Sequence, residues 1–586
     1  MQKHQDFVSL VWENVQAHGD DGSFTFITEE RGGKYKENVL GFAELDRKAR
    51  ALACRLEARG LRDRAVLLLY PEGLEFLTAF LGCLYARVIA VPAPLPDLDT
   101  GRCERTRRII EDAGIASILT DTAHRAALGT WPPGTGPKGR LPILDTEAVE
   151  DDPAGWTPPG HRPETLAFLQ YTSGSTSEPK GVMITHANLL CNGEEIARRI
   201  EGTPGTVGVG WVPHHHDMGL VGQFLQPLYL GCRYVFTSPI TFIKRPVLWL
   251  ELITRYRGTV TVAPNFGYEL ALRRVTDRQL DGLDLSSLRV VKNGAEPVRA
   301  ATLERMAQRF APVGFRPGMW MPCYGMAETT LLVTAAPRGS GAVVRDFDAD
   351  ALALGSAVPA PAGGEDGARR LVSCGRPVTL DVAVVDPDTR ASLPEGRVGE
   401  IWVRGGSVAQ GYWENPDATR ETFGAHTSGG DGPYLRTGDL GFLAAGELYV
   451  TGRIKDLIIV NGRNIHAHDI EEAARDAHPA ALTGAAFVLD DGAAREHVVI
   501  VQEISTRIAA GTPLDELASL IKTAVARAFE LPALSVVLSG RGTVRRTTSG
   551  KTQRRQTRDA FLSGQISGLA GDLEVSVDQK IHLDRT

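Results

Sequence analysis

The segment richest in chemically active side chains is the loop 171–181, which reads YTSGSTSEPKG. Hydroxyls and backbone N–H groups at a flexible glycine turn can surround phosphate oxygens, and a lysine adds a mobile positive charge. Apolar runs of strand length flank the loop at 166–171 and 181–185. The sequence therefore predicts a triphosphate-binding loop between two strands, formed by Thr172, Ser173, Gly174, Ser175, Thr176 and Lys180.

Two other interpretations of this loop are open. A Walker-type loop needs Gly-Lys followed by Ser or Thr and then a helix. Here Lys180 follows Pro179 and precedes a predicted strand, which excludes that motif. The glycine, proline and serine residues of the loop also fit a plain polar hairpin turn. Such a turn needs neither so many hydroxyls nor the lysine.

Three later segments carry charged groups that a resemblance to a known family, rather than their chemistry alone, singles out for the same ligand. Glu328, in YGMAETT, offers a carboxylate to a hard divalent cation. Asp439, in YLRTGD, can accept hydrogen bonds from two hydroxyls. Lys551, in TTSGK, can lower the cost of bringing two anions together. Each residue also has a purely structural interpretation. Glu328 could belong to a helix cap beside an aromatic residue, Asp439 could be an ordinary turn aspartate, and Lys551 could lie on a solvated basic surface.

A run of three histidines lies in the segment 211–219, WVPHHHDMG. Adjacent side chains point in different directions on a strand or a helix, so neighbouring histidines rarely share one ion. No cysteine or second histidine pair has ligand spacing. The pattern therefore does not predict a metal site here.

The composition is that of an ordinary globular protein. The chain has 586 residues, of which 43% are hydrophobic and 23% charged, and its net charge is −7, which argues against a nucleic-acid partner. Seven scattered cysteines without a CxxC pair favour reduced thiols. With no signal-peptide pattern and no apolar run of membrane-spanning length, we expect a cytoplasmic protein without a membrane span.

The first third of the chain predicts alternating strands and helices. An apolar strand at 65–70 is followed by a helix at 74–86 and a second strand at 88–91 that ends at Pro92. That order predicts parallel sheets with both faces covered.

We expect a large α/β domain over residues 1–454 and a small α+β domain over residues 455–570. A high density of Gly, Pro and Asp residues at 336–370 predicts an insertion or surface excursion in the large domain. In the small domain the patterns predict helices at 469–477 and 514–529 and strands at 485–489 and 497–501. The polar residues 571–586 predict a loose tail.

The ordered set of motifs resembles the adenylate-forming superfamily of acyl-CoA synthetases, peptide-synthetase adenylation domains and luciferases, and covers about residues 20–565. The resemblance implies a large N-terminal domain of stacked sheets and helices and a small mobile lid. It implies phosphate binding by the 171–181 loop and adenine binding by Tyr324. It implies an α-phosphate contact for Thr329, Mg²⁺ binding by Glu328, ribose binding by Asp439, and catalysis by Lys551.

Further residues gain roles by the same resemblance. Arg453 is the expected second ribose or phosphate contact, and Lys455 the expected hinge between the domains. The segments that flank the adenine are expected to include Gly294, Ala295, Glu296, Gly325 and Met326.

Within the superfamily, WVPHHHDMG resembles the WLPxxHDMG signature of fatty acyl-AMP ligases. The match covers His216, Asp217, Met218 and Gly219, and His216 is counted among the catalytic residues. His214 and His215 depart from the family's usual residues, which bears on the shape of the acyl site. The segment 336–370 stands where this family carries its insertion.

The resemblance implies ATP-dependent conversion of a fatty or related carboxylic acid to acyl-AMP, with ATP and Mg²⁺ and with release of pyrophosphate. The acyl group then passes to the phosphopantetheine thiol of an acyl carrier protein. One alternative is an acyl-CoA synthetase that ends on CoA. A second is an inactive homologue acting as a binding protein, although Lys180, Glu328, Asp439 and Lys551 are all present.

Overall fold

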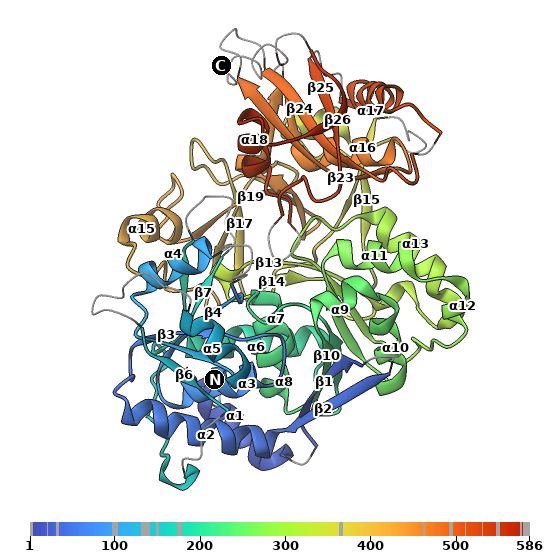
Figure 1. The fold of residues 1–586 in the computed structure, drawn as a ribbon. Coiled ribbons are helices and arrows are strands. Elements are labelled where there is room, and N and C mark those ends of the chain that lie inside the picture. Colours follow the sequence, from blue (N-terminus) through green and yellow to red (C-terminus); the bar gives the residue numbers. More distant parts are fainter. Residues whose placement is uncertain are drawn as a thin grey trace.

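The large domain contains two large sheets and a smaller third one, and a small α+β unit lies above it (Figure 1). The computed structural model describes residues 4–19, 21–30, 34–96, 103–130, 141–147, 152–172, 179–361, 367–460, 463–490, 496–509, 511–529, 531, 533–546, 551–574 and 577. In the part of the chain so described, no helix is both long enough and apolar enough to cross a bilayer.

One sheet of the large domain has six strands in the order β6-β5-β3-β4-β7-β8. All neighbours pair in parallel except β7 and β8, which are antiparallel. The predicted strand–helix–strand unit is confirmed, with α3 (Glu75–Tyr85) as the crossover. The strands are β3 (Ala65–Leu69), β4 (Ile89–Ala93), β5 (Ser117–Thr120), β6 (Ile143–Asp145), β7 (Leu166–Tyr171) and β8 (Gly181–Thr185).

The predicted strand end at Pro92 was wrong, because β4 continues through Pro92 to Ala93. Pro92 lies in register with Leu68 of β3. On its other side β4 meets β7 in register at Ala90 and Phe168. A proline lacks a backbone N–H, and it is tolerated where the ladder does not need that donor.

The second sheet has eight strands in the order β14-β13-β12-β11-β9-β10-β1-β2. Its core is parallel, and antiparallel strands close both ends. The strands are β1 (Ser23–Glu29), β2 (Tyr35–Gly41), β9 (Val207–Gly210), β10 (Arg233–Thr237), β11 (Val260–Ala263), β12 (Val290–Asn293), β13 (Trp320–Gly325) and β14 (Leu332–Ala335).

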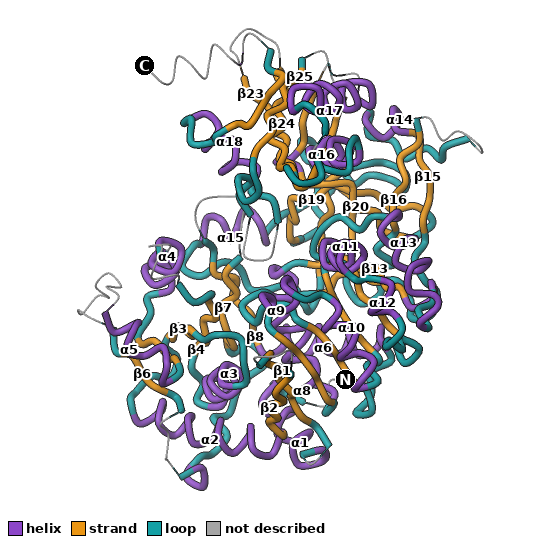
Figure 2. Tube along the Cα trace, turned by 45° about the vertical axis from the view of Figure 1, so that its right-hand side comes forward, coloured by secondary structure: helices purple, strands orange, loops and turns teal. Residues whose placement is uncertain are grey.

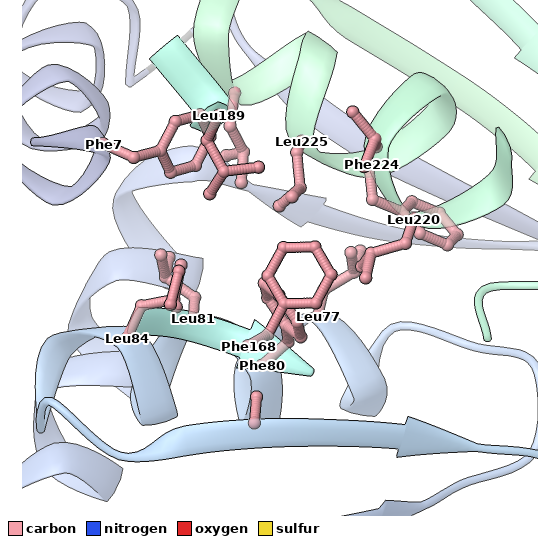
Figure 3. Packing of buried hydrophobic residues seen from close by; sticks show 14 of the residues in the cluster. Phe7, Leu77, Phe80, Leu81, Leu84, Phe168, Leu189, Leu220, Phe224 and Leu225 are labelled. Carbon is pink, nitrogen blue, oxygen red and sulfur yellow. The ribbon is translucent and has the colours of Figure 1, made fainter. Parts of the chain in front are cut away.

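Helices cover both sheets, and a continuous apolar core lies between them. Figure 3 shows Phe80 and Phe168 packed beneath Leu220, Phe224 and Leu225. The longer helices of the large domain are α1 (Phe7–His18), α2 (Phe42–Ala58), α4 (Glu104–Ala113), α5 (Thr122–Thr130), α6 (His186–Ile200), α10 (Val247–Tyr256), α11 (Asn265–Arg274), α13 (Ala300–Phe310) and α15 (Pro416–Phe423).

A third, antiparallel sheet completes the large domain with the strand order β17-β18-β19-β20. Its strands are β17 (Asp381–Val385), β18 (Gly399–Arg404), β19 (Leu435–Ala444) and β20 (Glu447–Arg453). The excursion expected at 336–370 contains an antiparallel hairpin, β15 (Val344–Asp348) and β16 (Ala368–Val372), with α14 (Ala349–Ala353) between. Phe347 of β15 packs edge-on against Phe442 of β19, which ties the hairpin to this sheet.

The small unit has its own sheet, in the order β23-β24-β25-β26, and its own apolar core (Figure 2). The predicted helices and strands are confirmed, with small shifts of their ends. The elements are β21 (Leu457–Val460), β22 (Arg463–His466), α16 (Ala467–Asp476), β23 (Ala481–Asp490), β24 (Glu496–Ile504), α17 (Leu514–Phe529), β25 (Leu534–Ser539), α18 (Arg554–Leu562) and β26 (Gly568–Asp572).

The loose tail was placed too early. Gly571 and Asp572 belong to β26, which pairs with β25. Lys522 Nζ binds Asp572 Oδ1 at 2.9 Å and Glu574 Oε1 at 2.9 Å. The polar composition did not separate a solvated strand edge from a tail, because an edge strand is polar on its open side. Residues 575–576 and 578–586 lie outside the described residues.

Candidate active site

A cavity of about 2650 Å³ lies at the junction of the large domain and the small unit. From the large domain it is lined by Tyr324, Asp439 and Arg453, among others. From the small unit Lys551 and Arg554 reach it. Residues predicted from segments more than two hundred positions apart therefore face one space.

The carboxylate of Asp439 is held by two donors. Tyr324 donates its hydroxyl hydrogen to Oδ2 at 2.8 Å, and Arg453 Nε donates to Oδ1 at 3.0 Å. Asp439 and Arg453 are register partners on β19 and β20, so the pair spans one antiparallel ladder. The negative charge of Asp439 raises the pKa of the Arg453 guanidinium. Burial raises the pKa of the Tyr324 hydroxyl, and the charge of Asp439 raises it further. The carboxylate is thereby fixed in orientation at 6% exposure.

The segments predicted to flank the adenine need close backbone approach. A Cβ on Gly325 would stand 1.7 Å from the carbonyl oxygen of Leu331, and one on Gly294 would stand 2.7 Å from Cys323 Sγ. Ala295 has φ +66°, a left-handed conformation that costs energy for a residue with a side chain. Beside it Glu296 Oε1 accepts from the Phe266 N–H at 2.5 Å.

Glu328 is a partly buried carboxyl group at the cavity wall. Tyr412 donates its hydroxyl hydrogen to Glu328 Oε1 at 3.0 Å, and the ring of Tyr412 receives the ammonium of Lys180 at 4.7 Å from its centroid. Burial raises the pKa of Glu328, and the negative charge of Asp217 raises it further. Two carboxyl groups near each other in a buried place favour a bound cation.

Lys551 is the cation that the small unit contributes. Burial lowers its pKa, and the charge of Arg453 lowers it further. Asp217, Asp439 and Glu296 act in the opposite direction, which places the ammonium within the field of three carboxylates. An ammonium in that position suits a negatively charged reaction centre.

His216 and Asp217 form a close pair at the start of the short helix α7 (Asp217–Gly219). His216 Nδ1 lies 2.6 Å from Asp217 Oδ1, and the N–H of Met218 donates to the same oxygen at 2.7 Å. Burial alone would raise the pKa of Asp217, but His216 and Lys551 outweigh it and the pKa is lowered. Asp217 is therefore a partly buried anion whose charge is stabilised by His216 and Lys551.

The two histidines that depart from the family's pattern have separate environments. His214 Nδ1 lies 2.8 Å from Glu72 Oε2, and its ring stacks on Phe76 with centroids 4.0 Å apart. The ring of His215 stands perpendicular to that of His214. One nitrogen of each histidine and one oxygen of Glu72 lie within 4.8 Å of one another, a grouping that the histidine spacing alone did not predict.

Some predicted site residues lie elsewhere or cannot be placed. Thr329 is 0% exposed, does not line the cavity, and donates its hydroxyl hydrogen to the Met326 carbonyl at 2.9 Å. Its α-phosphate contact stays a prediction. Gly294 does not line the cavity. Ser173, Gly174, Ser175 and Thr176 lie outside the described residues, whereas Thr172 lines the cavity.

Among the residues that the structure describes, three ion pairs join the small unit to the large domain. Arg369 Nη2 lies 2.9 Å from Asp469 Oδ2, Arg299 Nη1 lies 3.3 Å from Glu472 Oε1, and Arg463 Nη2 lies 2.5 Å from Asp350 Oδ1. Arg369 and Asp350 belong to the hairpin segment, and Asp469 and Glu472 to α16. Lys455, the predicted hinge, follows β20 directly and burial lowers its pKa.

Sequence reasoning gave no role to several residues of the cavity. Asp217 stood within the matched HDMG segment, so the motif itself could have named it. Tyr412 and Lys292 carried no local signal, because only the tertiary structure brings them to Glu328 and to the cavity wall.

The chain belongs to the AMP-binding enzyme family, whose model matches residues 11–413. Residues 455–570 match a second model, described as Disco-interacting protein 2-like, AMP domain. The protein is thus an adenylate-forming ligase, with the large domain and small C-terminal domain of that α/β fold.

Relatives that carry a substrate in their names cover nearly the whole chain. The chain is 43% identical over 547 residues to the medium-chain-fatty-acid–[acyl-carrier-protein] ligase JamA of Moorena producens, covering 92% of both. It is 37% identical to FadD21 of Mycobacterium tuberculosis, named as a fatty-acid–CoA ligase, over 96% of this chain and 99% of that one.

A solved structure shares the same architecture. It is a fatty acyl-adenylate ligase from L. pneumophila in complex with acyl adenylate and pyrophosphate. The TM-score is 0.75 and the identity 36%, covering 97% of this chain and 98% of that chain.

Proposed function

We propose that the protein activates a fatty or related carboxylic acid with ATP and passes the acyl group to the phosphopantetheine thiol of an acyl carrier protein. The observation that carries this proposal is the position of Lys551. A lysine of the small unit enters the cavity opposite the Asp439–Arg453 pair and near Asp217 and Glu296.

In the first half-reaction an oxygen of the acid's carboxylate attacks the α-phosphorus of ATP, and the bond from that phosphorus to the pyrophosphate oxygen breaks. Asp439 binds the ribose hydroxyls, and Tyr324 packs on the adenine. Two anions must approach each other, and the ammonium of Lys551 offsets their repulsion and the charge that develops in the transition state. The hydroxyls of the 171–181 loop and Lys180 hold the leaving phosphates.

Glu328 fits a divalent cation bound with the triphosphate. It is a partly buried carboxyl group that lines the cavity, and a second carboxyl group, that of Asp217, lines the same cavity. Oxygen donors of this kind suit Mg²⁺, which binds through one or two carboxylates and the substrate's phosphates. When bound there, Mg²⁺ neutralises charge on the leaving pyrophosphate.

In the second half-reaction the small unit turns about Lys455, so that Lys551 withdraws and the carrier's thiol reaches the mixed anhydride. Sulfur bonds to the acyl carbon, AMP leaves, and the thiol proton passes to solvent. This division places the domain boundary at 454–455. The three cross-domain ion pairs are the contacts that this rotation must break.

The likeness to JamA supports a carrier protein as acceptor, whereas the name of FadD21 keeps CoA as the alternative. Purified enzyme, ATP, Mg²⁺ and a panel of fatty acids are incubated with holo-carrier protein, with apo-carrier protein or with CoA. We expect pyrophosphate release and an acyl mass increment on the holo-carrier protein. Abundant acyl-CoA contradicts the acceptor, and absent pyrophosphate exchange across the panel indicates an inactive homologue.

A further inference from the structure

One buried cation of the cavity wall has no role in the scheme above. Lys292 lies on β12, is 8% exposed, and lines the cavity. Its backbone is fixed, because Tyr268 donates its hydroxyl hydrogen to the Lys292 carbonyl at 2.6 Å. Its register partner on β13 is Met321, so the two side chains lie on the same face of the sheet. Met321 and Cys323 line the same cavity.

Three of the arginines that line the same cavity have a carboxylate partner. Arg199 Nε lies 2.6 Å from Glu195 Oε1, Arg453 Nε lies 3.0 Å from Asp439 Oδ1, and Arg554 Nε lies 2.7 Å from Glu471 Oε1. A buried charge without such a partner is costly, so proteins rarely keep one.

Lys292 departs from that rule. Burial lowers its pKa, and the group that acts in the opposite direction is the Cys323 thiol rather than a carboxylate. Within the described residues no carboxylate lies within ion-pair distance of Lys292. Because the residue lines the cavity, a ligand can supply the anion that the chain does not.

The place of Lys292 indicates which ligand this is. Strands rise about 3.3 Å per residue, so Lys292 stands roughly 7 Å along β12 from Gly294, where the adenine-flanking segment begins. Apolar side chains such as Trp211, Val262 and Leu331 line the cavity with it. Under the proposed function, the chain of the acid is the part of the substrate that suits this apolar region.

Resting on the proposed function, we propose that Lys292 binds a second carboxylate on the acid, so that the substrate class is a dicarboxylic acid rather than a plain fatty acid. An ammonium and a carboxylate form a charge-assisted hydrogen bond that is strong when water is excluded. A plain chain leaves the ammonium buried and unpaired, and a site built for a polar group rejects the analogue that lacks it.

The test compares acids of equal length with and without the second carboxylate. Pyrophosphate release gives kcat/KM for a series of straight-chain dicarboxylic acids and for the matching monocarboxylic acids. The enzymes are the wild type, Lys292→Met, and the control Lys244→Met, which removes an exposed lysine on α9 (Pro239–Lys244). We expect the wild type to favour one dicarboxylic acid of the series. Lys292→Met should lower that preference about ten- to hundredfold.

Lys292→Met should also raise kcat/KM for the matching monocarboxylic acid, because an apolar side chain then meets an apolar chain. The control should keep the wild-type ratio. If Lys292→Met fails to fold in a thermal-unfolding scan, Lys292→Gln replaces it, since glutamine keeps polarity but not charge, and the same loss of preference is expected.

Two results overturn the assignment. If the ratio of kcat/KM for dicarboxylic to monocarboxylic acids is unchanged in both Lys292 variants, the lysine does not bind the second carboxylate. An equal loss for every acid shows that it serves the nucleotide instead. In either case activity with some acid leaves the proposed function standing. A wild type that releases no pyrophosphate with any acid refutes the proposed function, and this inference with it.

Discussion

The two halves of the candidate site are held in different ways. In the large domain, Asp439 accepts from Tyr324 at 2.8 Å and from Arg453 at 3.0 Å, and Arg453 is its register partner on the adjacent strand. In the small unit, Lys551 faces the cavity within the field of carboxylates that belong to the other domain. The first half is preorganised for binding, whereas the second depends on how the domains are docked. We therefore expect binding and chemistry to be separable by mutation.

The largest effect should come from Lys551→Ala. Formation of acyl-AMP should fall by about a hundredfold or more, because one preorganised charge at a reaction centre contributes that much. Transfer from supplied acyl-AMP to the holo-carrier protein should survive. The two steps are measured by pyrophosphate exchange and by carrier acylation. Equal loss in both assays contradicts the separation of the two halves.

Asp439→Asn should weaken ATP binding more than it slows the chemical step. The KM for ATP should rise about tenfold or more, because an amide accepts ribose hydrogen bonds less strongly and leaves Arg453 without its anion. At saturating ATP the turnover should fall less. Tyr324→Phe, which removes one of the two donors to Asp439, should raise KM less than Asp439→Asn does. A fall in kcat at unchanged KM would place Asp439 in the chemical step instead.

The pH dependence of acyl-AMP formation tests the Lys551 half of the site without any mutation at the nucleotide-binding half. Burial and Arg453 lower the pKa of Lys551 below its ordinary value of 10.5. The charged form exists below the pKa and is lost as the pH rises through it. Acyl-AMP formation should therefore decline in the alkaline range at a lower pH than an ordinary lysine would give. Lys551→Arg, whose guanidinium stays charged, should lose that decline. A decline shared by both enzymes contradicts the assignment.

A smaller effect is expected where the halves are docked. Arg369→Ala removes the ion pair with Asp469 and should slow acyl-AMP formation two- to fivefold, because a partly exposed pair contributes about 1 kcal/mol or less. Transfer to the carrier should not slow. Arg370→Ala is the matched control, since Arg370 pairs with Glu304 and Asp346 inside the large domain. The same slowing in both variants would mean that the cross-domain contact does not matter.

The smallest effect should follow Thr329→Val. The hydroxyl is fully buried and donates to the Met326 carbonyl, so its loss should reduce the free energy of unfolding by about 1 kcal/mol. The KM for ATP should change less than about threefold. A loss of adenylation near that of Lys551→Ala would instead restore the α-phosphate contact that the motif predicted.

Sequence patterns predicted the small unit well. The helix over 514–529 coincides with α17, and the strands at 485–489 and 497–501 lie within β23 and β24. Apolar periodicity is strong where one face of an element meets a single core, as here. The strand end at Pro92 and the tail from 571 failed, because ladder partners decide whether a proline or a polar edge stays in a sheet.

The site shows the same boundary between local and tertiary information. The motifs by themselves determined the residue types that could hold a nucleotide, since hydroxyls, carboxylates and lysines have fixed chemistry. Only the tertiary structure decided which of them meet: it brought Lys551 to the cavity that Asp439 lines and took Thr329 out of it. It also placed Lys292 on the cavity wall, where burial lowers its pKa. Burial and partners depend on strand order and domain docking, and no stretch of sequence records those.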